Sequence, residues 1–319
     1  MDLSTESAVP AFTRLRLFLA LSRTLHGGLD MAAPFLAALI WLGGFPSLSV
    51  GLIGAGTVFA GYTAVYALND LLGYRLDRDK LRLQLGEDAE GLSYLDAALM
   101  RHPLAQGALS FTEALAWTVF WAFLAIIGAW MLNPLCVVVF AGASLLEALY
   151  CLLFKVTPLR TLVNGAVKTA GPLAAVLAVD PSPSPGLLAL LLGCLLLWEV
   201  GGQNIPADWS DLETDRTLAA RTIPVVFGTR VAARISLASL AAALLASLIL
   251  FAVSPLAAPW WLIALIGGIG SFLLIAPAHR LLLNARVEDA MHLFNRASLW
   301  PLSLLLAGLL GVLVSGISL

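Results

Sequence analysis

Nine stretches of the 319-residue sequence are long and apolar enough to cross a lipid bilayer as helices. A helix needs about 20 residues to cross roughly 30 Å of hydrocarbon, and it satisfies its own backbone hydrogen bonds there. The stretches cover approximately residues 17–43, 49–68, 111–132, 134–154, 161–179, 186–205, 233–254, 258–280 and 298–317. The sequence therefore predicts an all-α, polytopic membrane protein, with residues 1–319 forming a single transmembrane domain.

The composition supports a membrane protein and gives no indication of a nucleic-acid-binding function. Only 12% of the residues are charged, whereas soluble domains carry roughly 25%. The formal net charge is −2, and nothing in this balance favours a nucleic-acid partner. The expected surroundings are the lipid bilayer.

The basic residues predict the orientation. All 18 lysines and arginines lie in or near the N-terminus or the segments that follow spans two, four, six and eight. The positive-inside rule places such segments in the cytoplasm. We therefore expect a cytoplasmic N-terminus and an outside C-terminus, in a membrane of the bacterial inner-membrane type. Residues 1–12 are expected to be mobile, and residues 69–110 to form an extended cytoplasmic loop with a short amphipathic helix near 85–100.

One acidic motif follows the sixth span. Asp208, Asp211 and Asp215 are spaced i, i+3, i+7, so on one helix they share a face. Asn204 lies about one turn earlier. Three like charges on one face need a cation, and Mg²⁺ is typically held by one or two carboxylates together with substrate phosphates.

A second group of acids follows the second span. Asn69 and Asp70 end that span, and Asp77 follows two turns later. Two such groups at the cytoplasmic ends of two helices have room between them for one or two Mg²⁺ ions and a diphosphate. Taken alone, each acidic group could equally be a solvated loop. The same pattern occurs twice, however, with an Asn followed by helically spaced acids, and this repetition favours a binding site. Basic candidates for the remaining phosphate charge are Arg78, Lys155, Lys168, Arg216 and Arg221.

These motifs resemble those of the UbiA superfamily of intramembrane prenyltransferases. Its signatures are Asn-Asp-x-x-Asp-x-x-x-Asp and Asp-x-x-Asp-x-x-x-Asp. The second is intact here, and the first has Gly73 in place of its middle acid. Further similar stretches are "YCLLFKVTPL" with Tyr150 and Lys155, "DRTLAARTIPVVFG" after the second motif, and "HPLAQGALSFTEAL", where His102 replaces an arginine.

The resemblance implies a nine-helix bundle around a central cavity that opens near the cytoplasmic face. It implies Mg²⁺-dependent transfer of a prenyl group from an allylic prenyl diphosphate to a lipophilic, aromatic acceptor. The catalytic residues would be Asp70, Asp77, Asp211 and Asp215, with Asp208 as a further metal ligand. The implied substrate-binding residues are Asn69, Arg23, Arg78, Tyr150, Lys155, Asn164, Lys168, Asn204, Arg216 and Arg221.

Other interpretations stay open at this point. One is a membrane terpene cyclase of the same superfamily, another is a transporter or binding protein for cations, and a third is a degenerate family member that lacks the acid at Gly73. Three acids that lie inside predicted spans, Asp30, Glu147 and Glu199, are interpreted as structural partners of neighbouring helices. His102 is interpreted as a solvated loop residue. The acceptor could be a phenol, a naphthoate, a tetrapyrrole or a glycerol lipid.

Overall fold

The computed structural model describes residues 11–84 and 100–317, and these residues form helices and loops without a strand. The expected helix at 85–100 falls almost wholly outside the described residues. The first half of the chain contains α1 (Ala11–Leu21), α2 (Thr24–Asp30), α3 (Ala32–Leu42), α4 (Leu48–Gln84), α5 (Phe111–Leu132), α6 (Pro134–Leu152), η2 (Leu153–Lys155) and α7 (Arg160–Val179). The second half contains α8 (Pro185–Trp198), η3 (Glu199–Asn204), α9 (Ile205–Ser210), α10 (Leu212–Thr217), α11 (Ile223–Phe227), α12 (Thr229–Val253), α13 (Trp260–Gly270), η4 (Ser271–Ile275), α14 (Ala276–Asn284), α15 (Val287–Ala297) and α16 (Trp300–Ile317).

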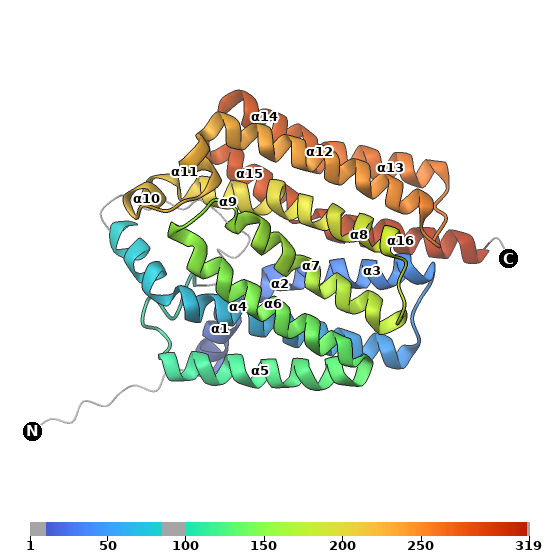
Figure 1. Cartoon of the computed structure of the whole chain (residues 1–319), viewed down its shortest axis with the longest axis horizontal. Coiled ribbons are helices and arrows are strands. Elements are labelled where there is room, and N and C mark those ends of the chain that lie inside the picture. The colour runs from blue at the N-terminus through green and yellow to red at the C-terminus, as the bar shows by residue number, and fades with distance from the viewer. Residues whose placement is uncertain (1–10, 85–99, 318–319) are drawn as a thin grey trace, which may run out of the picture.

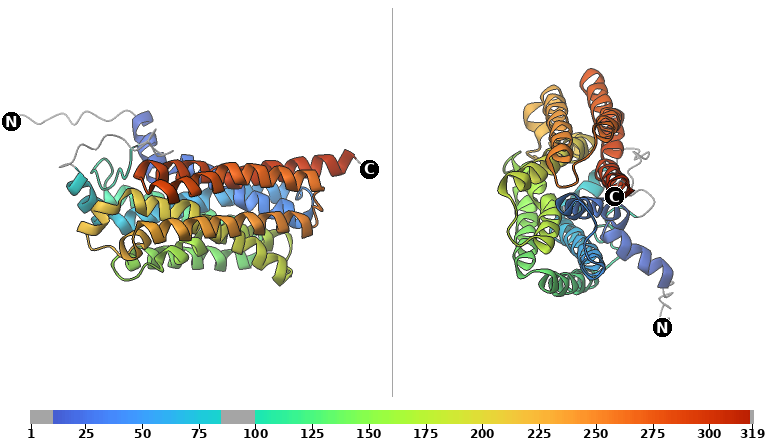
Figure 2. Two further views of the ribbon diagram at one scale, coloured as in Figure 1. Left: turned by 90° about the horizontal axis from the view of Figure 1, so that it is seen from above. Right: turned by 90° about the vertical axis from the view of Figure 1, so that its right-hand side faces the viewer.

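Within the described ranges, nine helical stretches are long and apolar enough to cross a membrane. They run side by side as one elongated bundle (Figures 1 and 2). This confirms the predicted all-α class and the predicted number of spans. The first span differs in detail, because Arg23 adopts a left-handed backbone conformation with φ 44° and separates α1 from α2.

The segment after the second span is helical where a loop was predicted. Helix α4 continues without a break through residues 69–84. At 1.5 Å per residue its 37 residues extend for about 55 Å, well beyond the roughly 30 Å of hydrocarbon. The prediction was wrong because falling hydropathy marks only the end of the apolar environment. The Leu, Arg and Lys residues that follow still form helix readily. The first acidic group therefore lies on a continuous helix.

The main apolar core lies between α3, α7, α8 and the helices of the second half. Trp300, Phe251 and Leu262 are fully buried there. Two glycines allow these helices to approach closely. A Cβ at Gly201 would lie 2.7 Å from the Ser236 carbonyl oxygen of α12, and one at Gly202 would lie 2.8 Å from Ala297 Cβ of α15.

The sixth and eighth spans each contain a π-helical segment, η3 and η4, followed after one residue by a proline. Pro206 follows η3 and Pro277 follows η4. A proline has no N–H and its ring collides with the carbonyl four residues earlier in a regular helix, and a π-bulge relieves this conflict locally. Both spans therefore continue past a proline, and the one in the sixth span leads directly into the second acidic motif.

Candidate active site

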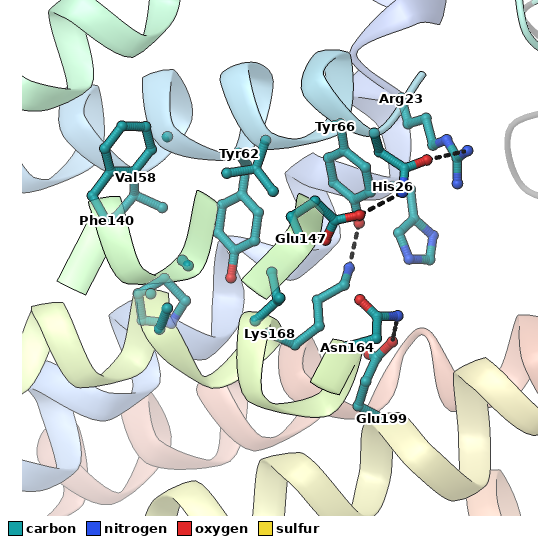
Figure 3. Close-up of a pocket in the computed structure, with 18 of the residues that line it drawn as sticks. Arg23, His26, Val58, Tyr62, Tyr66, Phe140, Glu147, Asn164, Lys168 and Glu199 are labelled. Carbon is teal, nitrogen blue, oxygen red and sulfur yellow. Dashed lines mark hydrogen bonds between the residues drawn. The ribbon is translucent and has the colours of Figure 1, made fainter. Parts of the chain in front are cut away.

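A cavity of about 700 Å³ runs through the bundle between α4, α6 and α7. Much of its wall is apolar, with Val58 on α4 and Phe140 on α6 (Figure 3). Its polar part contains Arg23, Asn69, Asp77, Asn164, Lys168, Asn204, Asp208 and Asp211. The cavity can therefore enclose a long apolar chain that ends in a charged group.

The first acidic group lies at the polar end of this cavity. Asp70 is buried, with a relative exposure of 2%. Arg23 donates hydrogen bonds to Asn69 Oδ1 at 3.4 Å and to Asp70 Oδ1 at 3.3 Å. Asn69 in turn donates to the Glu147 carboxylate of α6. The left-handed turn at Arg23 thus places a guanidinium against the carboxylate that begins the motif.

His102 completes this group, contrary to the interpretation of it as a solvated loop residue. Its Nδ1 lies 3.4 Å from Asp70 Oδ1 and 3.2 Å from Asp77 Oδ2. The loop that carries it is fixed to α4 by Leu104 and Leu109, which are buried against Leu71 and its neighbours. The sequence could not show this contact, because residues 85–99 separate the loop from α4.

The second motif is divided between two short helices instead of lying on one. Asp208 is on α9, Asp215 is on α10, and Asp211 lies at the junction with φ −97° and ψ 11°. The prediction that the three acids share one face of a single helix is therefore wrong. The carboxylates of Asp211 and Asp215 nevertheless lie close together, since a single ammonium group contacts both of them.

That ammonium belongs to Lys80, on the helix of the first motif. Lys80 Nζ lies 3.0 Å from Asp211 Oδ2 and 2.8 Å from Asp215 Oδ1. Arg101 Nη2 lies 3.5 Å from Asp211 Oδ2. The consecutive residues Arg101 and His102 therefore reach different motifs, and the two acidic groups form one continuous site.

Arg160 contacts the first acid of the second motif, Asp208. Its Nη1 lies 3.5 Å from Asp208 Oδ1, and its guanidinium carbon lies 4.0 Å from the centre of the Tyr150 ring. Lys80, Arg101 and Arg160 were not singled out from the sequence. A signal for Lys80 was present, because it follows Asp77 by three residues and shares its helix face.

The charges shift the pKa values of these groups. Burial opposes ionisation of Asp211, but Lys80 and Arg101 together hold its pKa below the ordinary value. Burial raises the pKa of Asp215 in spite of the contact with Lys80. Burial also opposes protonation of His102, but Asp70 and Asp77 raise its pKa above the usual value.

A separate polar group lines the wall of the cavity further along α4 and α7. Lys168 Nζ lies 2.5 Å from Asp30 Oδ2 and contacts the Tyr66 hydroxyl, which donates to the same carboxylate. Figure 3 shows the Lys168 ammonium pointing toward the Tyr66 hydroxyl, to which it is hydrogen-bonded. The charge of Lys168 is thus offset by Asp30, as is typical of a structural pair.

Amide groups form a second network on this wall. Asn164 Nδ2 donates to Asn204 Oδ1 at 2.8 Å, and Asn204 Nδ2 donates to Glu199 Oε1 at 2.8 Å. This network joins α7 to the π-helical segment η3. The side chains of Asn164 and Asn204 remain part of the cavity lining.

Several predicted substrate-binding residues lie away from the cavity. Lys155, Arg216 and Arg221 are exposed, and Arg216 Nη1 lies 2.7 Å from Glu213 Oε1. The guanidinium of Arg78 stacks on the Tyr74 ring at 5.4 Å. A role of these four residues in binding substrate remains a prediction.

The site fits a divalent cation. One ligand atom each from Asp70, Asp77 and His102 lies within 4.8 Å of the other two. The buried carboxylate of Asp215 makes no hydrogen bond of regular geometry, and the charge that offsets it comes from the Lys80 ammonium 2.8 Å away. Carboxylate oxygens are the ligands that Mg²⁺ prefers.

Comparison with known proteins identifies the class of this bundle. The profile of the UbiA prenyltransferase family matches residues 31–302. The chain belongs to this family of membrane-embedded prenyltransferases, which confirms the resemblance drawn from the two acidic motifs.

Relatives and solved structures agree with this assignment. The chain is 26% identical over 236 residues to the digeranylgeranylglyceryl phosphate synthase of Thermococcus sibiricus, covering 74% of this chain and 77% of the relative. The fold is similar to that of a UbiA homologue from Aeropyrum pernix, with TM-score 0.67, 21% identity and coverage of 89% and 97% of the two chains. It is also similar to a UbiA homologue from Archaeoglobus fulgidus bound to DMAPP and Mg²⁺, with TM-score 0.62, 18% identity and coverage of 93% and 99%.

Proposed function

We propose that this protein catalyses the Mg²⁺-dependent transfer of a prenyl group from an allylic prenyl diphosphate to a lipophilic acceptor within the membrane. The observation that carries the proposal is that Asp77, Asp208 and Asp211 line the polar part of a long, largely apolar cavity, with Asp70 and Asp215 directly behind the lining residues His102 and Lys80. The cavity suits a prenyl chain and the charged end suits its diphosphate. Mg²⁺ bound by these carboxylates would offset the charge of the diphosphate and make it a better leaving group.

The basic side chains would position the diphosphate. Arg23 and Arg160 line the cavity beside the first and second motif respectively, and Lys80 lies between them. Each is held by an acid, so each points into the site before substrate arrives. Such pre-organised cations stabilise charge that develops on the departing diphosphate oxygen.

The apolar wall would protect the allylic cation that forms when the C–O bond breaks. The diphosphate leaves with the bonding electron pair, and the acceptor then forms the new bond to the same carbon and releases its proton. Water in the cavity would quench the cation first. Apolar residues such as Val58 and Phe140 exclude water along the chain.

The chemical class of the acceptor is a more specific question within the proposal. The sequence favoured an aromatic acceptor, and the relative from Thermococcus sibiricus is named for a glyceryl phosphate product. The described cavity wall carries both aromatic rings, such as Tyr62, and cationic groups suited to a phosphate. We therefore propose a lipophilic acceptor and test both classes.

The experiment is incubation of purified protein with Mg²⁺, prenyl diphosphates of several lengths and single acceptors from both classes, with products identified by mass spectrometry. The expected result is a prenylated acceptor that forms only when Mg²⁺ is present. Release of diphosphate with a cyclised hydrocarbon product and no acceptor would instead indicate a terpene cyclase. Absence of any diphosphate release with every combination would contradict the proposal.

A further inference from the structure

The first motif has a histidine near the position where it lacks an acid. Asp70, Gly73 and Asp77 lie on successive turns of one face of α4, and Gly73 leaves the middle turn without a side chain. A Cβ at residue 73 would lie 2.9 Å from Asp77 Oδ2, so the Asp77 carboxylate occupies the space beside the glycine. His102 Nδ1 lies 3.2 Å from the same oxygen.

The fold holds His102 in this place at a conformational cost. Its φ is 51°, a left-handed value that is uncommon for residues other than glycine. It also precedes Pro103, and the residue before a proline normally prefers extended backbone. The buried side chains of Leu104 and Leu109 anchor the loop and so maintain this conformation.

The donor set is compact and shielded from water. The side chains of Asp70, Asp77 and His102 are 3%, 14% and 13% exposed. His102 Nδ1 is buried and faces both carboxylates at ion-pair distances, without a well-aligned hydrogen bond to either. One cation can contact all three groups, because their ligand atoms lie within 4.8 Å of one another.

We propose that Asp70, Asp77 and His102 Nδ1 form a mixed nitrogen–oxygen metal site that replaces an all-carboxylate first motif and favours first-row transition ions such as Co²⁺ over Mg²⁺. Mg²⁺ is a hard cation that takes oxygen ligands. Imidazole nitrogen adds affinity for transition ions, and this affinity increases from Mn²⁺ to Co²⁺. The inference rests on the metal requirement of the proposed function and adds the identity of one ligand and the selectivity that follows.

The test is direct binding of Co²⁺ to the full chain, purified without a histidine tag, followed by visible absorption, with Mg²⁺ measured by competition. His102→Ala should weaken Co²⁺ binding by at least about ten-fold, because even the loss of a residue that only supports a ligand costs a metal site about that much. Mg²⁺ binding should change little, so the preference for Co²⁺ falls. His279→Ala is the matched control, because His279 is exposed and should leave both affinities unchanged.

A double variant tests the replacement itself. Gly73→Asp combined with His102→Ala supplies a carboxylate to the middle turn and removes the nitrogen. Mg²⁺ should bind more tightly than in His102→Ala alone, while the preference for Co²⁺ stays low. Failure of the added acid to improve Mg²⁺ binding would show that the histidine does not stand in for it.

Two outcomes of the titration would overturn the proposal. Unchanged Co²⁺ affinity in His102→Ala would show that the nitrogen is not a ligand, and an equal loss of Co²⁺ and Mg²⁺ would show that His102 only positions the carboxylates. If the variant does not fold, pulsed electron paramagnetic resonance of the Mn²⁺-loaded parent, with and without ¹⁵N-labelled histidine, decides the matter. An absent imidazole coupling would overturn the proposal. These measurements involve no prenyl transfer, so failure of the proposed function would be seen separately.

Discussion

Lys80 Nζ lies 2.8 Å from Asp215 Oδ1, so the helix that carries the first acidic motif also supplies a cation to the second. The Lys80 side chain is only 17% exposed and the Asp215 side chain only 1%. An ion pair of this kind leaves an uncompensated buried charge when either partner is lost. It also places an ammonium beside the carboxylates that we propose for metal binding.

Replacing Lys80 should therefore destabilise the metal-free protein and make its stability depend more strongly on Mg²⁺. We expect Lys80→Met to lower the free energy of unfolding in EDTA on the order of 3 kcal/mol, and Mg²⁺ to recover much of this loss. Thermal unfolding in detergent measures both effects. The control is Arg82→Met, since Arg82 is on the same helix with a side chain 67% exposed. A loss of stability that is equal with and without Mg²⁺ would contradict the prediction.

Removing an acid of the second motif should abolish most of the activity without unfolding the protein. Asp211→Ala should reduce kcat/KM by about 100-fold or more, which corresponds to about 2.7 kcal/mol of transition-state stabilisation. The matched variant Glu213→Ala removes a carboxylate that is 75% exposed two residues away. It should remain close to the parent, and near-normal turnover by Asp211→Ala would exclude this residue from the mechanism.

Filling the apolar part of the cavity should shorten the prenyl chain that the enzyme accepts. Ala174 lines the cavity and lies 14 residues after Arg160, or about 21 Å along α7. Ala174→Trp should reduce the rate with long prenyl diphosphates and leave short ones almost unaffected. Leu162→Trp provides the control because Leu162 is 48% exposed on the same helix. Equal losses for all chain lengths would indicate general disruption instead.

Accessibility labelling tests the orientation. Single cysteines introduced at Ser49 and Ser182 should react from outside, whereas cysteines at Glu213 and Glu288 should react from the cytoplasm. All four positions are exposed, and the three native cysteines would first be replaced by alanine. Reaction of both pairs from the same side would contradict the alternating arrangement of the spans.

The fold was largely predictable because the bilayer requires long apolar helices and leaves little choice between structures. Hydropathy does not report what happens once a helix leaves the hydrocarbon, so the extent of α4 beyond Asn69 was missed. The left-handed break at Arg23 was missed for a similar reason, since apolar residues continue on both sides of it.

The two acidic motifs of the candidate site and their expected proximity could be read from the sequence, but the basic and histidine partners of the acids could not. Asp208, Asp211 and Asp215 were recognised by spacing, although a break at Asp211 replaces the expected single helix. The partners of the acids come from distant segments, and their contacts depend on tertiary packing. For this reason the sequence shows Lys80 only as a helical neighbour of Asp77 and His102 only as part of a family-like loop, and it shows the contact of neither.

The π-helical segment η3 bears on which deletions the sixth span can accept. Such a segment contains one residue more than a regular helix needs for the same path. A single deletion between Glu199 and Asn204 would therefore leave a regular helix over that path, and the residues beyond it would keep their direction. The Pro206 ring would then meet the carbonyl four residues earlier. The extra residue thus lets the chain pass a proline just before Asp208 without turning the second motif away from the first.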